Sequence, residues 1–505
     1  MPNVPVSAHS MGSIDVERSE QGLPAETPKP LDIVIVGAGL SGINAAYRVQ
    51  TQLPDHRYAV LEGRREVGGT WAFWKYPGFR TDSSMGLFGL PSYLEDCAAA
   101  EGIDKKIRLG HRVVVSSWSS EEQRWTLQVD VAREDGSVER KIIKAWWVIN
   151  ASGYYSYERP LPVEIPGIDK FAGQVVHLQF WDESVSHAGK KVVIIGSGVT
   201  AITLLPALAK TAGSVTMLQR TPSYVLSLPS KDTVPTSLAR FMPLSWARQI
   251  HWFLRMAIET LFVNYLLTFP NSGRHLVVKE MQKQLPAGFD VDKHFNPWYN
   301  PFEQRLCFCP RGDFFKALHR SNARVVTDTI ETVTETGILL TSGETLDADM
   351  IVTATSLFFE LMAGVLVSVD GVSVTDTLAS RYIWNGAMLE GVPNSGLITG
   401  YTAATWTPGA DVRVRQLIKV IKHMDKSGAT AATPYIDRQE RAKMPMLPGV
   451  GLSSTYLVSA RDRMPKVGTK APWLNGSNWA VDMWRLVTSN VRQGMKYTFG
   501  DKKDV

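Results

Sequence analysis

Two glycine-rich turns constrain the fold of this chain more than any other feature of its sequence. The first, Gly37-Ala38-Gly39-Leu40-Ser41-Gly42, follows the apolar run Leu31–Val36, and a helical pattern comes after it. The second, Gly196-Ser197-Gly198-Val199-Thr200-Ala201, follows the apolar run Lys191–Ile195 in the same way. Strand, tight turn and helix in this order predict a dinucleotide-binding unit. Two such units predict an α/β fold that holds two dinucleotides at once.

The residues of each turn have distinct roles in the Rossmann-like unit that we predict. The first glycine permits the turn, the second lets the pyrophosphate approach the backbone, and the third lets helix and strand pack closely. The phosphates lie at the helix N-terminus, where free N–H groups and the helix dipole favour anions. We therefore predict two sets of cofactor contacts: Gly37, Gly39, Ser41 and Gly42 in the first unit, and Gly196, Ser197, Gly198, Thr200 and Ala201 in the second.

One residue after each unit distinguishes the two nucleotides. Glu62 ends the next strand, about 20 positions after Gly42, where a carboxylate accepts hydrogen bonds from a ribose 2′-hydroxyl. A carboxylate there would repel a 2′-phosphate, so the first site is predicted to hold FAD or NAD. Arg220 has the corresponding place in the second unit, and a cation suits the extra phosphate of NADPH.

Composition excludes several other classes of protein. A chain of 505 residues is too long for one hydrophobic core and predicts two or three domains. The net charge of +5, without a run of Lys or Arg, argues against a nucleic-acid partner. Three cysteines, Cys97, Cys307 and Cys309, fit a reducing compartment, which favours the cytoplasm. No metal site is expected, because Cys307 and Cys309 have neither a second pair nor a nearby His.

The order of patterns along the chain predicts its domains. Residues 1–30 are polar and predict a disordered tail, 31–185 the first part of the FAD-binding domain, 186–345 the NADPH-binding domain, and 346–505 the second part of the FAD-binding domain. Long helical patterns near 241–296 interrupt the α/β rhythm and predict a helical insertion.

The most hydrophobic segment, Trp252 to Phe269, lies within this insertion. It is interrupted by Arg255 and Glu259, which argues against a membrane-spanning helix. A helix packed within the protein is favoured. Association with a membrane surface is the alternative that we do not favour.

The stretch between the two turns, Phe171 to Asp182, fits the pattern F-x-G-x-x-x-H-x-x-x-W-D. On this pattern the chain resembles the class B flavin monooxygenases, and the Trp181-Asp182 pair resembles the Baeyer–Villiger form. The resemblance runs from about Leu31 to beyond Trp406, and the residues of its motifs are most similar to those of the ethionamide-activating subgroup. Further motifs that carry it are Gly68-Gly69-Thr70-Trp71, Tyr76-Pro77-Gly78-Phe79-Arg80-Thr81-Asp82, Gln219-Arg220-Thr221-Pro222, Asn300 to Cys307, Ala348 to Thr355, and Tyr401 to Trp406.

The resemblance implies FAD and NADPH as cofactors, and O₂ and a small organic molecule as substrates. It also implies that Arg305 stabilises the anionic flavin peroxide, and that Asp82 holds this guanidinium in place. His177 is implied to be a conformational residue and not a base. Further cofactor contacts implied by the family motifs are Gly69, Thr70, Trp71, Arg80, Thr81, Asp82, Val114 and Thr221.

The chain departs from the family at three places. Ser356 stands where relatives generally carry glycine, so its Cβ would crowd the backbone if the position needs a positive φ. The connection from Asp82 to Ile103 is shorter than in relatives, and the region after Lys470 matches only loosely.

Three functional hypotheses follow. The first is Baeyer–Villiger oxidation of a ketone to an ester or lactone, which would suit specialised-metabolite biosynthesis. The second is heteroatom oxidation or epoxidation by the same flavin. The third, kept open by the short connection after Asp82, is a degenerate flavoprotein or NADPH oxidase that does not oxygenate a substrate.

Overall fold

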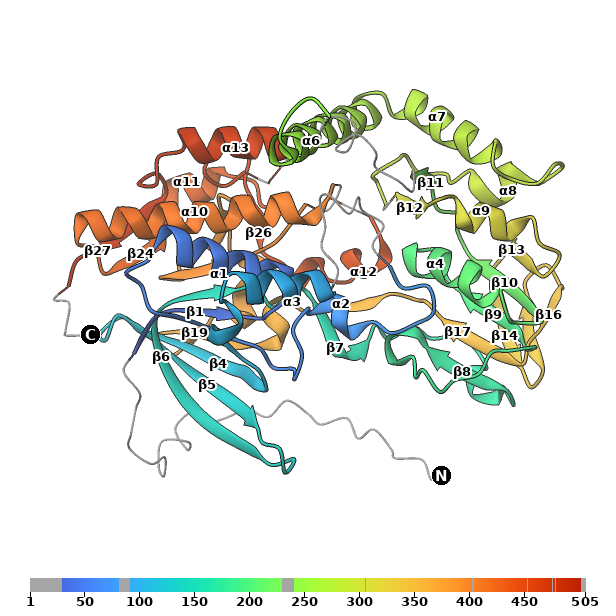
Figure 1. Cartoon of the computed structure of the whole chain (residues 1–505), viewed down its shortest axis with the longest axis horizontal. Helices are drawn as coiled ribbons and strands as arrows, with labels where there is room; N and C mark the ends of the chain where they lie inside the picture. The colour runs from blue at the N-terminus through green and yellow to red at the C-terminus, as the bar shows by residue number, and fades with distance from the viewer. Residues whose placement is uncertain are drawn as a thin grey trace.

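The computed structural model describes residues 30–80, 91–228, 240–304, 306–401, 404–451, 453–474, 476 and 478–500. Two sheets lie side by side, and their helices cover them (Figure 1). Each sheet contains one of the two glycine-rich turns, so the predicted α/β fold with two Rossmann-like units is confirmed.

The first sheet has nine strands in the order β20-β19-β4-β5-β6-β1-β2-β3, with β23 paired to β6. The parallel strands β1 and β2 are joined by helix α1, as a dinucleotide-binding unit requires. Ile33, Val34 and Ile35 of β1 are completely buried, because neighbouring layers cover both faces of a central parallel strand. The strands are β1 (Leu31–Val36), β2 (Tyr58–Leu61), β3 (Ile107–Arg108), β4 (His111–Ser119), β5 (Arg124–Ala132), β6 (Val138–Asn150), β19 (Leu366–Val369), β20 (Val372–Ser373) and β23 (Ser395–Leu397).

Helices α1 (Leu40–Gln52) and α10 (Trp406–Ser427) pack together over this sheet. Their apolar residues enter one core with Ile33 and Ile35, and Arg48 of α1 forms an ion pair of 2.8 Å with Asp411 of α10. The end of the chain also belongs to this part, since β27 (Met495–Thr498) pairs antiparallel with β24 (Ala431–Pro434). The loosely matching region after Lys470 is thus integrated into the fold.

The second sheet has five parallel strands in the order β13-β10-β9-β17-β8. Its strands are β8 (Gln174–His177), β9 (Lys191–Ile195), β10 (Ser214–Gln219), β13 (Ala323–Thr327) and β17 (Met350–Thr353), and its helices include α4 (Val199–Leu208) and α9 (Asp313–Leu318). Strands β8 and β17 lie outside the segment 186–345 that the sequence assigned to the NADPH domain. The second sheet therefore begins earlier and ends later than those boundaries.

The chain passes between the two sheets twice. The first passage contains β7 (Tyr155–Pro160), and the return contains β18 (Leu357–Phe359). These two strands pair antiparallel with each other. The two passages therefore form one ribbon between the sheets.

Further short elements surround this framework. They are α2 (Thr70–Phe73), α3 (Pro91–Ala100), α11 (Arg438–Lys443), α12 (Thr455–Val458), the parallel pair β11 (Val225–Leu228) and β12 (Cys307–Pro310), the small sheet β14 (Ile330–Thr334), β15 (Gly337–Leu340) and β16 (Thr345–Asp347), and the pairs β21 (Ile383–Trp384) with β22 (Met388–Leu389) and β25 (Leu447–Pro448) with β26 (Lys466–Val467).

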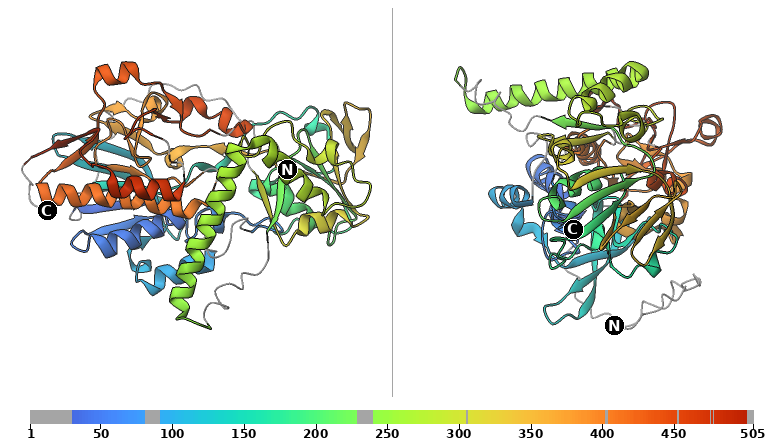
Figure 2. Two further views of the ribbon diagram at one scale, coloured as in Figure 1. Left: turned by 90° about the horizontal axis from the view of Figure 1, so that it is seen from above. Right: turned by 90° about the vertical axis from the view of Figure 1, so that its right-hand side faces the viewer.

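The predicted helical insertion is present as α6 (Leu244–Thr268), α7 (Pro270–Gln282) and α8 (Val291–Phe295). Viewed from above, α6 runs across the junction between the two halves of the molecule (Figure 2, left). Ala247, His251, Met256 and Leu266 of α6 are buried and its other face is exposed, so the helix packs against the protein with one face and is not enclosed within it. In the described part of the chain, no helix combines the length and apolarity needed to cross a bilayer.

Candidate functional site

A cavity of 1470 Å³ lies at the carboxyl ends of β1, β9 and β17, where the two sheets face each other. In α/β sheets, ligands bind at this end of the strands. The cavity reaches from the first glycine-rich turn to the second. Most of the described residues that the sequence predicts as cofactor contacts line it: Gly37, Gly39, Ser41, Glu62, Gly69, Thr70, Trp71, Arg80, Gly196, Ser197, Gly198, Thr200, Arg220 and Thr221.

The first turn has the geometry that its glycines require. Gly37 has a φ of 102°, and a Cβ there would lie 2.8 Å from the Ala151 carbonyl oxygen. A Cβ on Gly42 would lie 1.8 Å from the Gly37 carbonyl oxygen, so Gly42 serves helix packing and does not line the cavity. Gly39 precedes α1 and faces Gly69, which leaves the backbone N–H groups of the helix end open to an anion.

Glu62 lies beside this turn with only 7% of its surface exposed. Its carboxylate accepts hydrogen bonds from the backbone N–H of Ala38 at 2.7 Å and of Arg64 at 3.0 Å. Burial raises the pKa of Glu62, and the two backbone N–H groups partly oppose this shift. The carboxylate is fixed at the wall of the cavity by the turn itself.

Replacing Glu62 with glutamine is expected to make the stability of the flavin-free protein less dependent on pH. Because the pKa is raised in the folded state, the unfolded chain releases this proton first as the pH rises. The free energy of unfolding therefore decreases as the pH rises from the pKa of Glu62 in the unfolded chain to its higher pKa in the folded protein. Glutamine does not titrate, so it removes this decrease. Urea unfolding from pH 4 to pH 8 measures the free energy of unfolding of both proteins. Glu331→Gln, at an exposed position on β14, is the control. An unchanged pH profile would contradict the expectation.

The second turn leaves more open space beside its second glycine than the first turn does. Gly196 has a φ of 141°, and a Cβ there would lie 2.5 Å from the Ala354 carbonyl oxygen of the segment after β17. A Cβ on Gly198 would meet none of the described atoms within 4 Å, so the start of α4 is open to a ligand. Ala201 is completely buried and does not line the cavity. Arg220 is exposed at the cavity wall and has no ion-pair partner among the described residues.

Two further predicted contacts link neighbouring elements. Thr70 Oγ1 lies 3.0 Å from the hydroxyl of Tyr157, whose pKa burial raises to about 12. The Arg80 guanidinium donates a hydrogen bond to Asp313 of α9 at 2.8 Å. This ion pair joins the segment after α2 to a helix of the second sheet.

Besides Gly42 and Ala201, four predicted residues are not placed in the cavity by the structure. Val114 lies where the register of β4 and β5 shifts, and its neighbour Val113 lines the cavity instead. Thr81, Asp82 and Arg305 lie outside the described residues. On either side of Arg305, Gln304 and Leu306 both line the cavity.

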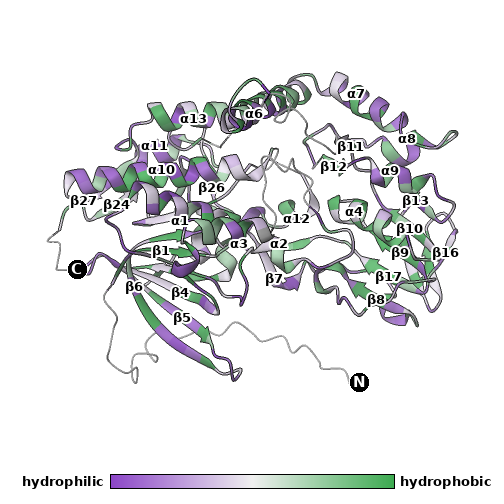
Figure 3. Ribbon diagram, in the orientation of Figure 1, coloured by the Kyte–Doolittle hydropathy of each residue, from purple (hydrophilic) through white to green (hydrophobic). Residues whose placement is uncertain are grey.

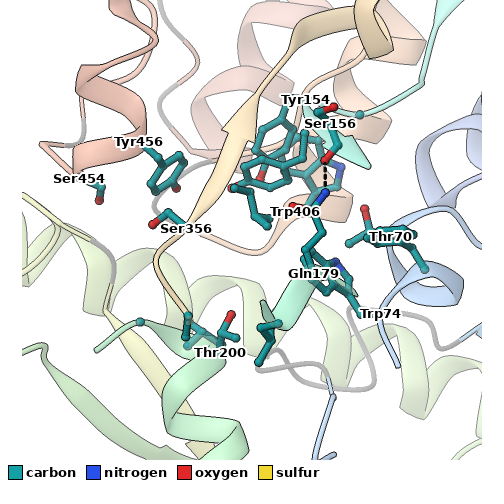
Figure 4. Close-up of a pocket in the computed structure, with 18 of the residues that line it drawn as sticks. Thr70, Trp74, Tyr154, Ser156, Gln179, Thr200, Ser356, Trp406, Ser454 and Tyr456 are labelled. Carbon is teal, nitrogen blue, oxygen red and sulfur yellow. Dashed lines mark hydrogen bonds between the residues drawn. The ribbon is translucent and has the colours of Figure 1, made fainter. Parts of the chain in front are cut away.

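The Phe171–Asp182 stretch forms β8 and the turn after it. His177 lines the cavity, and burial lowers its pKa. Its Nδ1 accepts from the backbone N–H of Gln179 at 3.2 Å, and the Gln179 side chain donates to the Ser156 carbonyl oxygen of β7 at 3.0 Å (Figure 4). The stretch thus connects the second sheet to the ribbon between the sheets. Trp181 is buried and is not among the residues that line the cavity.

Sequence reasoning missed an aromatic wall between the two turns. Tyr154 stacks on Trp406, the first residue of α10, with ring centroids 5.0 Å apart (Figure 4). Trp406 also donates from Nε1 to Ser41 Oγ of the first turn at 3.1 Å. Tyr154 follows the end of β6, and that position is a general signal for a ligand contact. Trp406 ends the family motif Tyr401 to Trp406, but that motif gave no contact for its side chain.

A second missed contact comes from α6. Glu259, at the cavity wall, accepts from the backbone N–H of Thr405 at 2.7 Å and from its hydroxyl at 3.0 Å. Thr405 is the N-cap residue immediately before α10, so a carboxylate from α6 caps this helix, as the positive end of a helix dipole favours. The sequence signalled Glu259 only as a charge that interrupts an apolar segment.

Ser356 lines the cavity with a φ of 91° (Figure 4). The position thus needs the left-handed region that glycine adopts freely, which explains why a serine there is unusual.

Ser356→Gly is expected to stabilise the protein by about 1 kcal/mol, because a strained residue costs roughly 1–3 kcal/mol and the extra freedom of an unfolded glycine about 0.5–1 kcal/mol. Guanidinium unfolding of the FAD-bound protein measures it. Ser184→Gly, at an exposed position with negative φ, should destabilise slightly. Destabilisation by both changes would show that the Ser356 backbone is not strained.

Comparisons with known proteins agree with this geometry. The family model "Flavin-binding monooxygenase-like" matches residues 74–269, and "NAD(P)-binding Rossmann-like domain" matches residues 35–99. The FAD-containing monooxygenase EthA of Mycolicibacterium smegmatis is 42% identical over 90% of this chain and 94% of its own length. EthA of Mycobacterium tuberculosis is 38% identical over 90% of this chain and 95% of its own length.

Solved structures share the fold at low sequence identity. An oxidised steroid monooxygenase bound to NADP is 21% identical with a TM-score of 0.72, over 94% of this chain and all of that one. Polycyclic ketone monooxygenase from the fungus Thermothelomyces thermophila is 18% identical with a TM-score of 0.74, over 95% of this chain and 91% of that one. The chain belongs to the class B flavin monooxygenases near EthA, and it is an NADPH-dependent enzyme that uses FAD.

Proposed function

We propose that this enzyme carries out Baeyer–Villiger oxidation, inserting one oxygen atom of O₂ beside the carbonyl of a ketone to give an ester or lactone. The observation that carries the proposal is the shared cavity, which runs between both glycine-rich turns and the aromatic wall of Tyr154 and Trp406. The Trp181-Asp182 ending of the fingerprint supports the Baeyer–Villiger form of the reaction.

The residues of the first turn fit FAD. The start of α1 has no acidic side chain in its first turn, and Gly39 and Gly69 leave the backbone accessible to a pyrophosphate. We assign ribose binding to Glu62, whose buried carboxylate lies at the cavity wall. Bound there in its reduced form, FAD would supply the electrons that activate O₂, one oxygen atom of which is inserted into the substrate.

The residues of the second turn fit NADPH. The open backbone at Gly198 and the start of α4, again without an acidic side chain in its first turn, suit a pyrophosphate. We assign recognition of the 2′-phosphate to Arg220, whose guanidinium has no carboxylate partner in the described part of the chain. Bound there, NADPH would supply the two electrons that reduce the flavin, and the second oxygen atom of O₂ would leave as water.

We assign the oxygenation step to Arg305. Its neighbours Gln304 and Leu306 line the cavity, and a guanidinium beside the reacting atoms would stabilise negative charge that develops on oxygen. Asp82 is assigned the role of orienting that guanidinium, because a charge-paired arginine tolerates burial better than a lone one.

Product identification tests the proposal. The purified enzyme is incubated with NADPH, ¹⁸O₂ and a panel of aliphatic, cyclic and aryl ketones, alongside sulfides and alkenes of matched size. Mass spectrometry should find esters or lactones that carry one ¹⁸O atom. Sulfoxides or epoxides alone would establish oxidation of heteroatoms or alkenes instead. NADPH consumption that yields only H₂O₂ across the panel would indicate an oxidase.

A further inference from the structure

The outward face of α6 is apolar from Trp246 to Leu261. Trp246, Ile250, Leu254 and Leu261 lie on this face, with exposed fractions of 65%, 39%, 49% and 70%, and none of them lines the cavity. A helix face that is turned to water normally presents charged and polar residues. Among the described residues, none buries this stripe.

The apolar surface continues onto a second helix, α13 (Trp479–Thr488). Trp479 of α13 contacts Trp252 and Phe253 of α6 edge to face, with ring centroids 5.1 and 5.8 Å apart. On α13, Trp484 and Val487 are 70% and 72% exposed. Figure 1 places both helices along the same side of the molecule, and Figure 3 shows hydrophobic residues along each. We call this combined face the α6–α13 surface.

The exposed charges that accompany α6 are positive. Arg240 and Arg248 are exposed at its N-terminal end. Its acidic side chain, Glu259, points away from the stripe to cap α10 at Thr405. Apolar and aromatic side chains flanked by arginines are the composition of helices that lie in the headgroup region of an anionic bilayer.

We propose that the α6–α13 surface docks on a membrane that contains anionic phospholipid. Helix α6 lies along the upper edge of the molecule (Figure 2, right), where its exposed apolar side chains can enter the headgroup region. A second copy is a poorer occupant, because a symmetric pairing of α6 would bring two sets of arginines to the same interface. The enzyme lies on the bilayer and does not cross it.

Docking places the active-site cavity beside the membrane. Phe262 and Val263, on the inner side of α6, line the cavity. One helix, about 10 Å across, then separates the bilayer from the space between the two cofactor turns.

Vesicle sedimentation of the full-length, FAD-bound enzyme tests the proposal. We expect binding to phosphatidylcholine vesicles that contain phosphatidylglycerol, weaker binding to phosphatidylcholine alone, and partial release by salt. Leu254→Gln with Leu261→Gln should lower binding by about tenfold, because each removes apolar surface from the bilayer. Arg240→Gln with Arg248→Gln should lower binding by roughly tenfold for anionic vesicles only.

The matched control changes two exposed apolar residues of the first sheet. Val138 and Leu366 are 63% and 55% exposed, and Val138 begins β6 in the β5–β6 hairpin, on the other side of the molecule from α6 (Figure 1). Val138→Gln with Leu366→Gln should leave binding unchanged, and retained flavin shows that each variant folds. The proposal is overturned if the wild type does not sediment with anionic vesicles. It is also overturned if the variant with Leu254→Gln and Leu261→Gln binds these vesicles as tightly as the control with Val138→Gln and Leu366→Gln. A third contrary result is a dimer, seen by light scattering, that Leu254→Gln and Leu261→Gln dissociate without any vesicle binding.

Discussion

Replacing Arg305 with alanine is expected to lower product formation by on the order of 10²–10³ while FAD stays bound. This is the usual cost of removing one preorganised group that stabilises developing charge. The flavin should remain because its proposed contacts, Glu62 and the turn from Gly37, belong to the first sheet. NADPH oxidation should fall less, because we assign the guanidinium to the oxygenation step, so the variant should release more H₂O₂ per NADPH consumed.

Product yield and H₂O₂ release, measured in parallel with the flavin spectrum, check this prediction. Arg311→Ala is the matched control, because Arg311 is exposed on the same segment and is not among the cavity-lining residues. Asp82→Ala should show a milder version of the Arg305 defect, since a positioning residue is lost and the charge remains. Product formation at the wild-type rate in Arg305→Ala would refute the assignment.

Arg220→Ala should remove most of the preference for NADPH over NADH. A charge-assisted hydrogen bond contributes about 1.5–3 kcal/mol, which corresponds to roughly 10- to 150-fold in discrimination. In the structure Arg220 is exposed at the cavity wall, so its loss should not disturb the fold. The expected change is a fall in kcat/KM with NADPH and little change with NADH.

Steady-state kinetics with the two nucleotides give the answer directly. Arg220→Lys keeps the charge but loses the bidentate geometry, and it should retain part of the preference. Lys210, at the end of the helical pattern, offers an exposed cation for comparison, and Lys210→Ala should alter neither constant. An equal loss with both nucleotides would mean that Arg220 supports the structure and does not read the phosphate.

The features that the sequence predicts well are local. A strand, a glycine turn and a helix follow one another within a few residues, so the motif alone predicts the positive φ of Gly37 and Gly196 and the close approach of Gly42 to Gly37. Ser356 is a further example, because its departure from glycine predicted a strained position and the structure gives it a φ of 91°.

The features that the sequence does not predict depend on distant partners. Strand β8 resembles an ordinary apolar run, and only its pairing with β17 places it in the second sheet. Tyr154 and Trp406 become neighbours because the end of β6 and the start of α10 meet at the same cavity. The outward direction of Leu261 follows from how α6 is seated on the molecule, and hydrophobicity alone suggested the opposite.

The ribbon of β7 and β18 limits how the two sheets can move relative to each other. A single connecting strand would act as a swivel, free to rotate about its own axis. Two antiparallel strands joined by hydrogen bonds resist that torsion and leave bending as the soft motion. Relative motion of the two sheets should therefore be mainly a bending of this ribbon, which would open and close the cavity between the two glycine-rich turns.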